Sequence, residues 1–309
     1  MSNVIIPATL SLLTLVYSSS SLAQTSDAKS AERCQSRLSI TFLGTPEAQG
    51  LGDVASTVDS YLKRDEFIDR FSSFLNSQFN QEPGETSVED SAYHVAKRVL
   101  TEGKPYRDLF VGPYNVVANG DQVQVMDDPN GYGYFSSEAW KLRYAGDEPT
   151  GLRLIAAYLL ISNIVGHKMK ATTNAPDADI SPTGRAQTGC KECHFENWFA
   201  LDPLAEALSR VQRDADMNVT GFTDPTPAQL PETVLGGLTV TSEKDLIQKL
   251  VDSENFRFNA CQLSFKFLYG RKENSCESGV FDKCMAAFSN SGMIQDAIRA
   301  VATDSSYCQ

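Results

Sequence analysis

Apolar residues recur with helical spacing along most of the chain. In residues 60–79 they fall three and four positions apart, which predicts one face of an amphipathic helix. These positions are Phe67, Ile68, Phe71, Phe74, Leu75 and Phe79. The same spacing predicts a helix over residues 88–102, with Gly103 and Pro105 as its stop signals. A strongly apolar run from Leu152 to about Val165 predicts a further helix.

The rest of the chain alternates turn-rich stretches with shorter helical patterns. Residues 104–135 are rich in turn formers, and Val123 and Val125 within them could form a short strand. Residues 216–240 read as a linker or long loop. Further helices are expected after His194 to about Val211, over 242–251 with Ser242 and Asp245 as a capping pair, over 256–269 before Gly270, and near 279–288 and 293–303.

This succession predicts a mainly α fold, an irregular helical bundle with long loops. No internal repeat is visible. We expect a signal peptide over residues 1–23, an N-terminal helical region over 24–150, a cytochrome-c-like haem-binding region over 151–215 and a disulfide-stapled helical region over 216–309. A hydrophobic fraction of 41% and a charged fraction of 21% are typical of an ordinary soluble globule.

The most specific chemistry lies in Cys190-Lys191-Glu192-Cys193-His194, a C-x-x-C-H pattern of covalent haem attachment. Two thiols three positions apart can each add to one vinyl group of a porphyrin. The next residue then presents an imidazole nitrogen to the iron from the same side. We therefore expect one haem c per chain, held by Cys190 and Cys193 as thioethers, with His194 as the proximal axial ligand of the haem iron.

Three other readings of the two cysteines fit less well. A thioredoxin-like redox pair normally opens a helix after a buried strand, whereas the polar run of residues 178–185 precedes this motif. A structural zinc site needs a second Cys/His pair at similar spacing, and the remaining cysteines contain no second C-x-x-C. A plain disulfide across C-x-x-C would be an unusual, very tight loop.

The sixth ligand of the iron decides between electron transfer and catalysis, because an open position admits peroxide, O₂ or NO. His167 follows an apolar helix and precedes the haem loop, and Met169 offers a thioether two residues later. Either could be the distal ligand, and an open site is the third option. His94 lies opposite the apolar stripe of its helix and is expected at the surface.

The N-terminus indicates export. An apolar run over residues 4–17, followed by small residues up to Ala23, is typical of a secretory signal peptide cut after Ala23. The stretch is short for a membrane span, and no other segment is long and apolar enough for one. We expect a periplasmic or extracellular protein without a membrane span after cleavage, which also suits haem attachment at a C-x-x-C-H motif.

Charge and cysteine usage fit that compartment. The net charge of −12 argues against nucleic acid and anionic membranes as partners and favours a basic redox protein, although it also serves solubility alone. Seven cysteines suit an oxidising environment. Once the haem pair is removed, the others form an odd set, so one stays free or pairs between chains: Cys34, Cys261, Cys276, Cys284 and Cys308. We expect one or two disulfides in the C-terminal region, and Cys34 could tie the N-terminal segment to it.

Several short segments resemble a family of exported bacterial proteins that carry one c-type haem in a large helical body. They are residues 37–46, 104–110, Cys190–His194 with Leu201-Asp202-Pro203, Cys261 with residues 267–271, and residues 288–292. The role of that family is largely undefined. The resemblance implies the helical fold and Cys190, Cys193 and His194 as haem residues, and it implies no distal ligand.

The sequence thus predicts an exported mono-haem c-type cytochrome-like protein that transfers electrons through its covalently attached haem. One alternative is a peroxidase-like haem enzyme with an open distal site, although no clear Arg-His pair for it stands out. The other is a secreted interaction or sensor protein in which the haem is structural. An electron carrier is favoured over a catalyst, and no catalytic residue is assigned.

Overall fold

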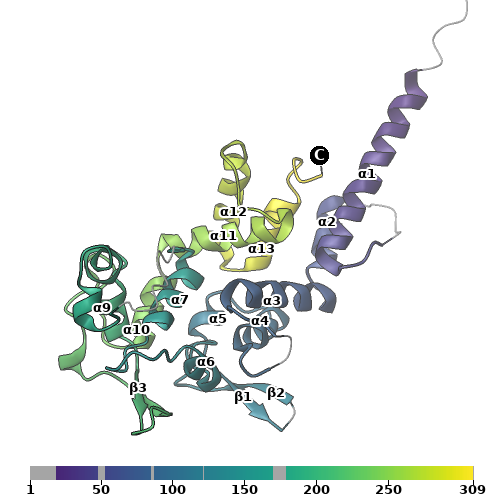
Figure 1. The fold of residues 1–309 in the computed structure, drawn as a ribbon. Helices are drawn as coiled ribbons and strands as arrows, with labels where there is room; N and C mark the ends of the chain where they lie inside the picture. Colours follow the sequence, from purple (N-terminus) through teal and green to yellow (C-terminus); the bar gives the residue numbers. More distant parts are fainter. Residues whose placement is uncertain (1–18, 48–52, 85–86, 121, 170–178, 309) are drawn as a thin grey trace, which may run out of the picture.

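The computed structural model describes residues 19–47, 53–84, 87–120, 122–169 and 179–308 (Figure 1). The predicted mainly α fold is confirmed. The apolar run of the predicted leader lies outside the described residues, and the predicted cut after Ala23 falls within helix α1. The α-helices are α1 (Ser19–Leu43), α2 (Val54–Tyr61), α3 (Asp65–Phe79), α4 (Ser91–Thr101), α5 (Asp108–Val111), α6 (Glu138–Arg143), α7 (Leu154–Val165), α8 (Pro182–Arg185), α9 (Leu201–Glu206), α10 (Glu243–Val251), α11 (Glu254–Tyr269), α12 (Ser278–Ser291) and α13 (Ile294–Ala302).

The N-terminal helices follow the apolar pattern, with one break. The helix expected over 60–79 is two helices, because the chain is extended at Arg64 between α2 and α3. The Arg64 guanidinium forms ion pairs with Glu47 and Glu66, which fixes this corner. Helix α3 buries its predicted face, where the rings of Phe67 and Phe71 stack with centroids 5.7 Å apart. Helix α4 ends close to the predicted stop.

Two antiparallel hairpins interrupt the helices. The predicted strand around Val123 is confirmed as β2 (Gln122–Asp127), which pairs with β1 (Tyr114–Asn119). The second hairpin, β3 (Arg210–Arg213) with β4 (Val219–Thr223), was not predicted. Its second strand lies inside the stretch that was expected to be a loop.

The prediction of a helix that reaches Val211 is wrong, because α9 ends at Glu206. The backbone beyond it is held by other segments. The Ser209 amide donates to a carboxylate oxygen of Glu243 at 2.9 Å, and the Val211 amide donates to the carbonyl oxygen of Gly151 at 3.0 Å. These tertiary hydrogen bonds replace the ones a longer helix would make, and the chain continues as β3.

The C-terminal helices agree closely with the sequence. Ser242 caps α10 by accepting a hydrogen bond from the Asp245 amide at 3.1 Å. Helix α11 ends at Gly270, which has a left-handed backbone with φ of 70°. Such a conformation favours glycine because it has no β-carbon. Helices α11, α12 and α13 pack against one another at the C-terminal end of the chain (Figure 1).

Two disulfides connect these parts. Cys261 in α11 is bonded to Cys284 in α12, which confirms a staple in the C-terminal region. Cys34 in α1 is bonded to Cys308, so the N-terminal and C-terminal segments are tied together. Cys276 is exposed and unpaired. In the part of the chain that the structure describes, no helix has the length and apolarity to cross a membrane.

Helices α7, α9 and α10 gather at one end of the molecule, away from α1 (Figure 1). A buried ion pair fastens them. Arg153, at the start of α7, donates to Glu243 at the start of α10 with 2.6 Å between nitrogen and oxygen, and both side chains are almost fully buried. Arg153 also donates to Ser209, just beyond α9. This end of the fold carries the C-x-x-C-H segment.

The turn that leads to Cys308 depends on an ionised carboxylate. Asp304 accepts hydrogen bonds from Lys283 at 2.8 Å and from the amide and hydroxyl of Ser306, which lower the pKa of Asp304 to about 2 from an ordinary 3.8. Because the pKa of Asp304 is lower in the folded protein than in the unfolded one, the ionised carboxylate stabilises the fold at pH values above the unfolded pKa. This stabilisation is lost as the pH falls toward 2. Asp304→Asn should lower the free energy of unfolding by about 1 kcal/mol at pH 7, after allowance for solvent screening at Lys283.

Urea denaturation of wild type and variant at several pH values measures this difference, which should shrink between pH 4 and pH 2. Asp282→Asn on the exposed side of α12 is the matched control. If the difference in the free energy of unfolding between wild type and Asp304→Asn stays constant down to pH 2, the ionised Asp304 does not stabilise the fold as stated.

Candidate functional site

The C-x-x-C-H segment forms a widened helical turn. The Cys190 carbonyl oxygen accepts from the His194 amide at 3.2 Å, four residues on, whereas the Glu192 carbonyl oxygen accepts from the Asn197 amide at 3.0 Å, five residues on. The second bond makes Glu192–Glu196 a π-helical turn. Such turns occur often at functional sites because they displace side chains from regular helical positions.

Both thiols and the imidazole border one cavity of about 460 Å³. Neither Cys190 nor Cys193 takes part in a disulfide, and the Cys190 side chain is exposed. Besides the charged side chains of Asp147, Glu148, Asp179 and Arg185, the cavity is lined by apolar side chains, several of them from the start of α7. These are Leu152, Leu154, Ile155, Tyr158, Met169, Ile180 and Leu201. The volume is within the range of about 300–1,000 Å³ typical of ligand cavities.

The His194 ring is held from one side by a buried carboxylate. Its Nδ1 lies 2.7 Å from an oxygen of Asp202, the second residue of α9, which is 2% exposed. A neutral imidazole that donates from Nδ1 carries its lone pair on Nε2. Since Nδ1 is engaged by Asp202, Nε2 is the nitrogen that remains for a ligand.

Asp202 is in turn held by Arg185, which is 4% exposed and closes helix α8. The guanidinium donates to one oxygen of Asp202 from Nε at 2.9 Å and from Nη2 at 2.7 Å. Burial raises the pKa of Asp202, but the hydrogen bonds from His194 and Arg185 and their charges outweigh it and hold that pKa below its ordinary value. Asp202 is therefore an ionised carboxylate behind the imidazole.

A second buried carboxylate completes this network. Arg185 lies 3.3 Å from Glu148, and it also donates to the carbonyl oxygen of Ile180. The other oxygen of Glu148 accepts from the amides of Thr150 and Leu152 at 2.7 and 3.2 Å. One arginine thus connects the chain before α7, the turn before α8 and the first turn of α9. Each of these segments contributes to the cavity wall.

The structure separates the two distal candidates. Met169 lines the same cavity as Cys190, Cys193 and His194. His167 packs instead against Phe199 and Trp198, with ring centroids 4.5 and 5.3 Å apart, and it does not line that cavity. His94 lies on α4, where its Nε2 is 3.1 Å from the Ser87 carbonyl oxygen.

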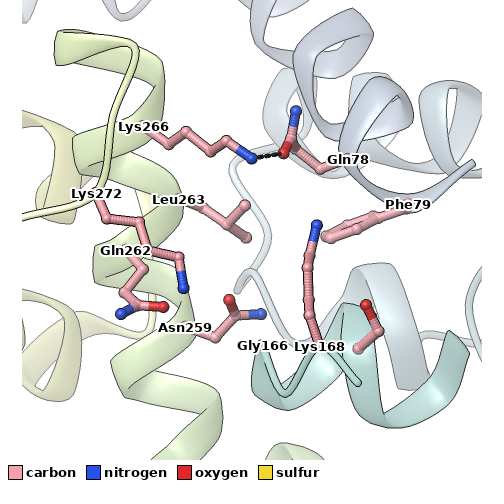
Figure 2. Close-up of a pocket in the computed structure, with 10 residues that line it drawn as sticks. Gln78, Phe79, Gly166, Lys168, Asn259, Gln262, Leu263, Lys266 and Lys272 are labelled. Carbon is pink, nitrogen blue, oxygen red and sulfur yellow. Dashed lines mark hydrogen bonds between the residues drawn. The ribbon is translucent and has the colours of Figure 1, made fainter. Parts of the chain in front are cut away.

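A second, much smaller cavity lies where the end of α7 meets α3 and α11 (Figure 2). Three lysines line it, and Lys266 donates to Gln78. Burial lowers the pKa of Lys168, and so do the positive charges of Lys266 and Lys272. The volume of about 30 Å³ accommodates little more than a water molecule, so this cavity is too small for a cofactor.

Sequence reasoning found both thiols and the imidazole but did not single out the charged residues behind them. Asp202 entered only as part of a short segment that resembles a family, and Arg185 and Glu148 carried no signal of their own. Among the residues described by the structure, no group of three or more His, Cys, Asp or Glu side chains could hold a bare metal ion.

Comparisons of the chain with models of protein families, with curated proteins and with solved structures find no match.

Arg185→Met would leave Asp202 and Glu148 buried without their shared cation. Removing one partner of a buried ionic network typically costs about 3–5 kcal/mol, so the free energy of unfolding should fall by about that amount. Arg107→Met is a matched control, because Arg107 pairs with Asp252 at the surface and should cost less than about 1 kcal/mol. Equal and small losses in denaturant titrations of the two variants would show that the network does not stabilise the fold.

Proposed function

We propose that the chain is a mono-haem c-type cytochrome-like protein that transfers electrons through a covalently attached haem. One observation carries this proposal. Two unpaired thiols and an imidazole, spaced C-x-x-C-H, border a single apolar cavity, and a buried carboxylate already orients the imidazole. The family resemblance of the sequence points the same way.

The residues present suit such a group. Cys190 and Cys193 would hold the haem through thioether bonds, and His194 Nε2 would be the proximal ligand. The aliphatic wall would exclude water from the ring, which favours the ferrous state and raises the reduction potential. When bound, the haem supplies a one-electron couple, while the protein binds it, orients it and keeps water away.

We propose Met169 over His167 as the distal ligand. Met169 borders the cavity, whereas His167 is packed against two aromatic rings and is not among the residues that line it. A protein-supplied sixth ligand favours an electron carrier, because small molecules then cannot reach the iron. The peroxidase-like alternative requires that position to be open.

The proposed setting is periplasmic or extracellular, and the two disulfides suit an oxidising compartment. We propose that a basic redox protein approaches the exposed side of the haem segment. Phe195 and Trp198 there are 40% and 44% exposed, and the exposed Glu192 adds negative charge beside them, while Glu196 is paired with Lys191. Apolar contact with surrounding charge is suited to brief encounters between redox proteins.

The haem assignment is tested on protein exported from a host that can mature c-type cytochromes. Intact mass should rise by one haem, and a pyridine haemochrome spectrum should show the c-type band. The double variant Cys190→Ser, Cys193→Ser should lose the covalent haem. Cys276→Ser, which removes an exposed thiol outside the site, should keep it. A wild-type protein of unmodified mass would contradict the cytochrome proposal.

The distal ligand is tested by cyanide binding to the ferric protein. Met169→Ala should open the sixth position, so that cyanide binds at least tenfold faster than in wild type. His167→Ala should leave the rate close to that of wild type. Fast binding to wild type itself, unchanged in both variants, would indicate an open site and favour the enzyme alternative.

A further inference from the structure

We propose that Asp202 is the positioning residue of the proximal ligand: its carboxylate, held in place by Arg185 and Glu148, fixes the tautomer of His194 and lowers the haem reduction potential. This inference rests on the proposed haem. It concerns residues that lie outside the C-x-x-C-H motif and adds a control of redox behaviour that the motif itself does not contain.

The contact between His194 and Asp202 fixes the position of a proton on the imidazole ring. The 2.7 Å contact between Nδ1 of His194 and Asp202 needs a proton between the two atoms, since an ionised carboxylate can only accept. Nδ1 therefore carries that proton, and the Nε2 lone pair is available to the iron. Metal-bound histidines usually donate their second nitrogen to such a partner, which fixes the ring and raises its basicity.

The buried group of Arg185, Asp202 and Glu148 carries a net negative charge. Arg185 contributes one positive charge, and Asp202 and Glu148 each contribute a negative charge, so the buried group carries a net charge of −1. All three residues are at most 5% exposed, so water screens this charge weakly. Negative charge behind the ligand favours the ferric state, because that state carries one more positive charge. The carboxylate therefore opposes the effect of the apolar cavity wall.

Several buried hydrogen bonds hold the Asp202 carboxylate in place. Arg185 grips Asp202 with two nitrogens and reaches Glu148 with the third, and Glu148 is anchored by two backbone amides. Asp202 also sits in the first turn of α9, where the helix dipole favours a negative side chain. The carboxylate cannot turn away from His194 without breaking several buried hydrogen bonds.

A purely structural role is the competing explanation, in which Asp202 merely neutralises Arg185. The two roles differ in their effect on the haem. A structural carboxylate changes unfolding but leaves the reduction potential alone, whereas a positioning carboxylate changes the potential of a folded protein.

The experiment compares haem-loaded wild type with Asp202→Asn by potentiometric titration. The amide keeps the size of the side chain and removes its charge. The midpoint potential should rise by at least 59 mV, which corresponds to a tenfold change in the equilibrium constant of a one-electron couple. Glu206→Gln is the matched control. Glu206 lies one turn further along α9 and loses the same charge, but it makes no hydrogen bond to His194, so a smaller shift is expected.

The outcomes separate the two proposals. A wild-type protein without covalent haem overturns the proposed function before any variant is compared. Haem-loaded Asp202→Asn with an unchanged potential, or a shift equal to that of Glu206→Gln, overturns the positioning role. If Asp202→Asn does not fold, ¹⁵N-edited NMR of the reduced wild type decides. A proton on His194 Nδ1 that is protected from exchange supports the hydrogen bond, and rapid exchange overturns it.

Discussion

The end of the molecule that carries the C-x-x-C-H segment depends on the burial of arginine charge. A guanidinium in the interior must find carboxylates and carbonyl oxygens, because its desolvation otherwise costs several kcal/mol. Arg185 satisfies this requirement with Asp202, Glu148 and the carbonyl of Ile180, which come from three separate segments. If those segments moved apart, a buried charge would be left without its partner. The same segments also form part of the wall of the large cavity.

A second buried arginine, Arg153, holds α7 against α10. Arg153, at the start of α7, binds Glu243 of α10 and Ser209, and Glu243 also accepts from the Ser209 amide, so these contacts hold the chain just beyond α9. Glu148 and Arg185 of the first cluster line the cavity, whereas Arg153 and Glu243 hold the neighbouring helices without lining it. The charged network around Arg185 therefore helps to keep this space open. Hydrophobic packing alone would tend to close it, because empty apolar volume is unfavourable.

The sequence predicted what depends on local pattern. The capped helix α10, the stop at Gly270 and the apolar face of α3 follow from spacing and from residue types that act within a few positions. The two thiols and the imidazole were likewise visible as a motif. The residues that position them were not, because the partners of Arg185 lie 17 and 37 positions away from it. The same reason explains the overextended helix after His194, whose end is set by contacts with Gly151 and Glu243.

The bond between Cys34 and Cys308 encloses 274 positions of the chain, and five other cysteines lie between its ends. Cys34 is synthesised first, and each of these thiols is synthesised before Cys308, the partner of Cys34. Proximity along the chain would therefore favour the wrong partners. The native pair becomes the nearest one only after the part of α1 around Cys34 and the segment after α13 have come together. Correct pairing is then a result of folding. The disulfide stabilises the contact between α1 and the segment after α13 that packing has already formed.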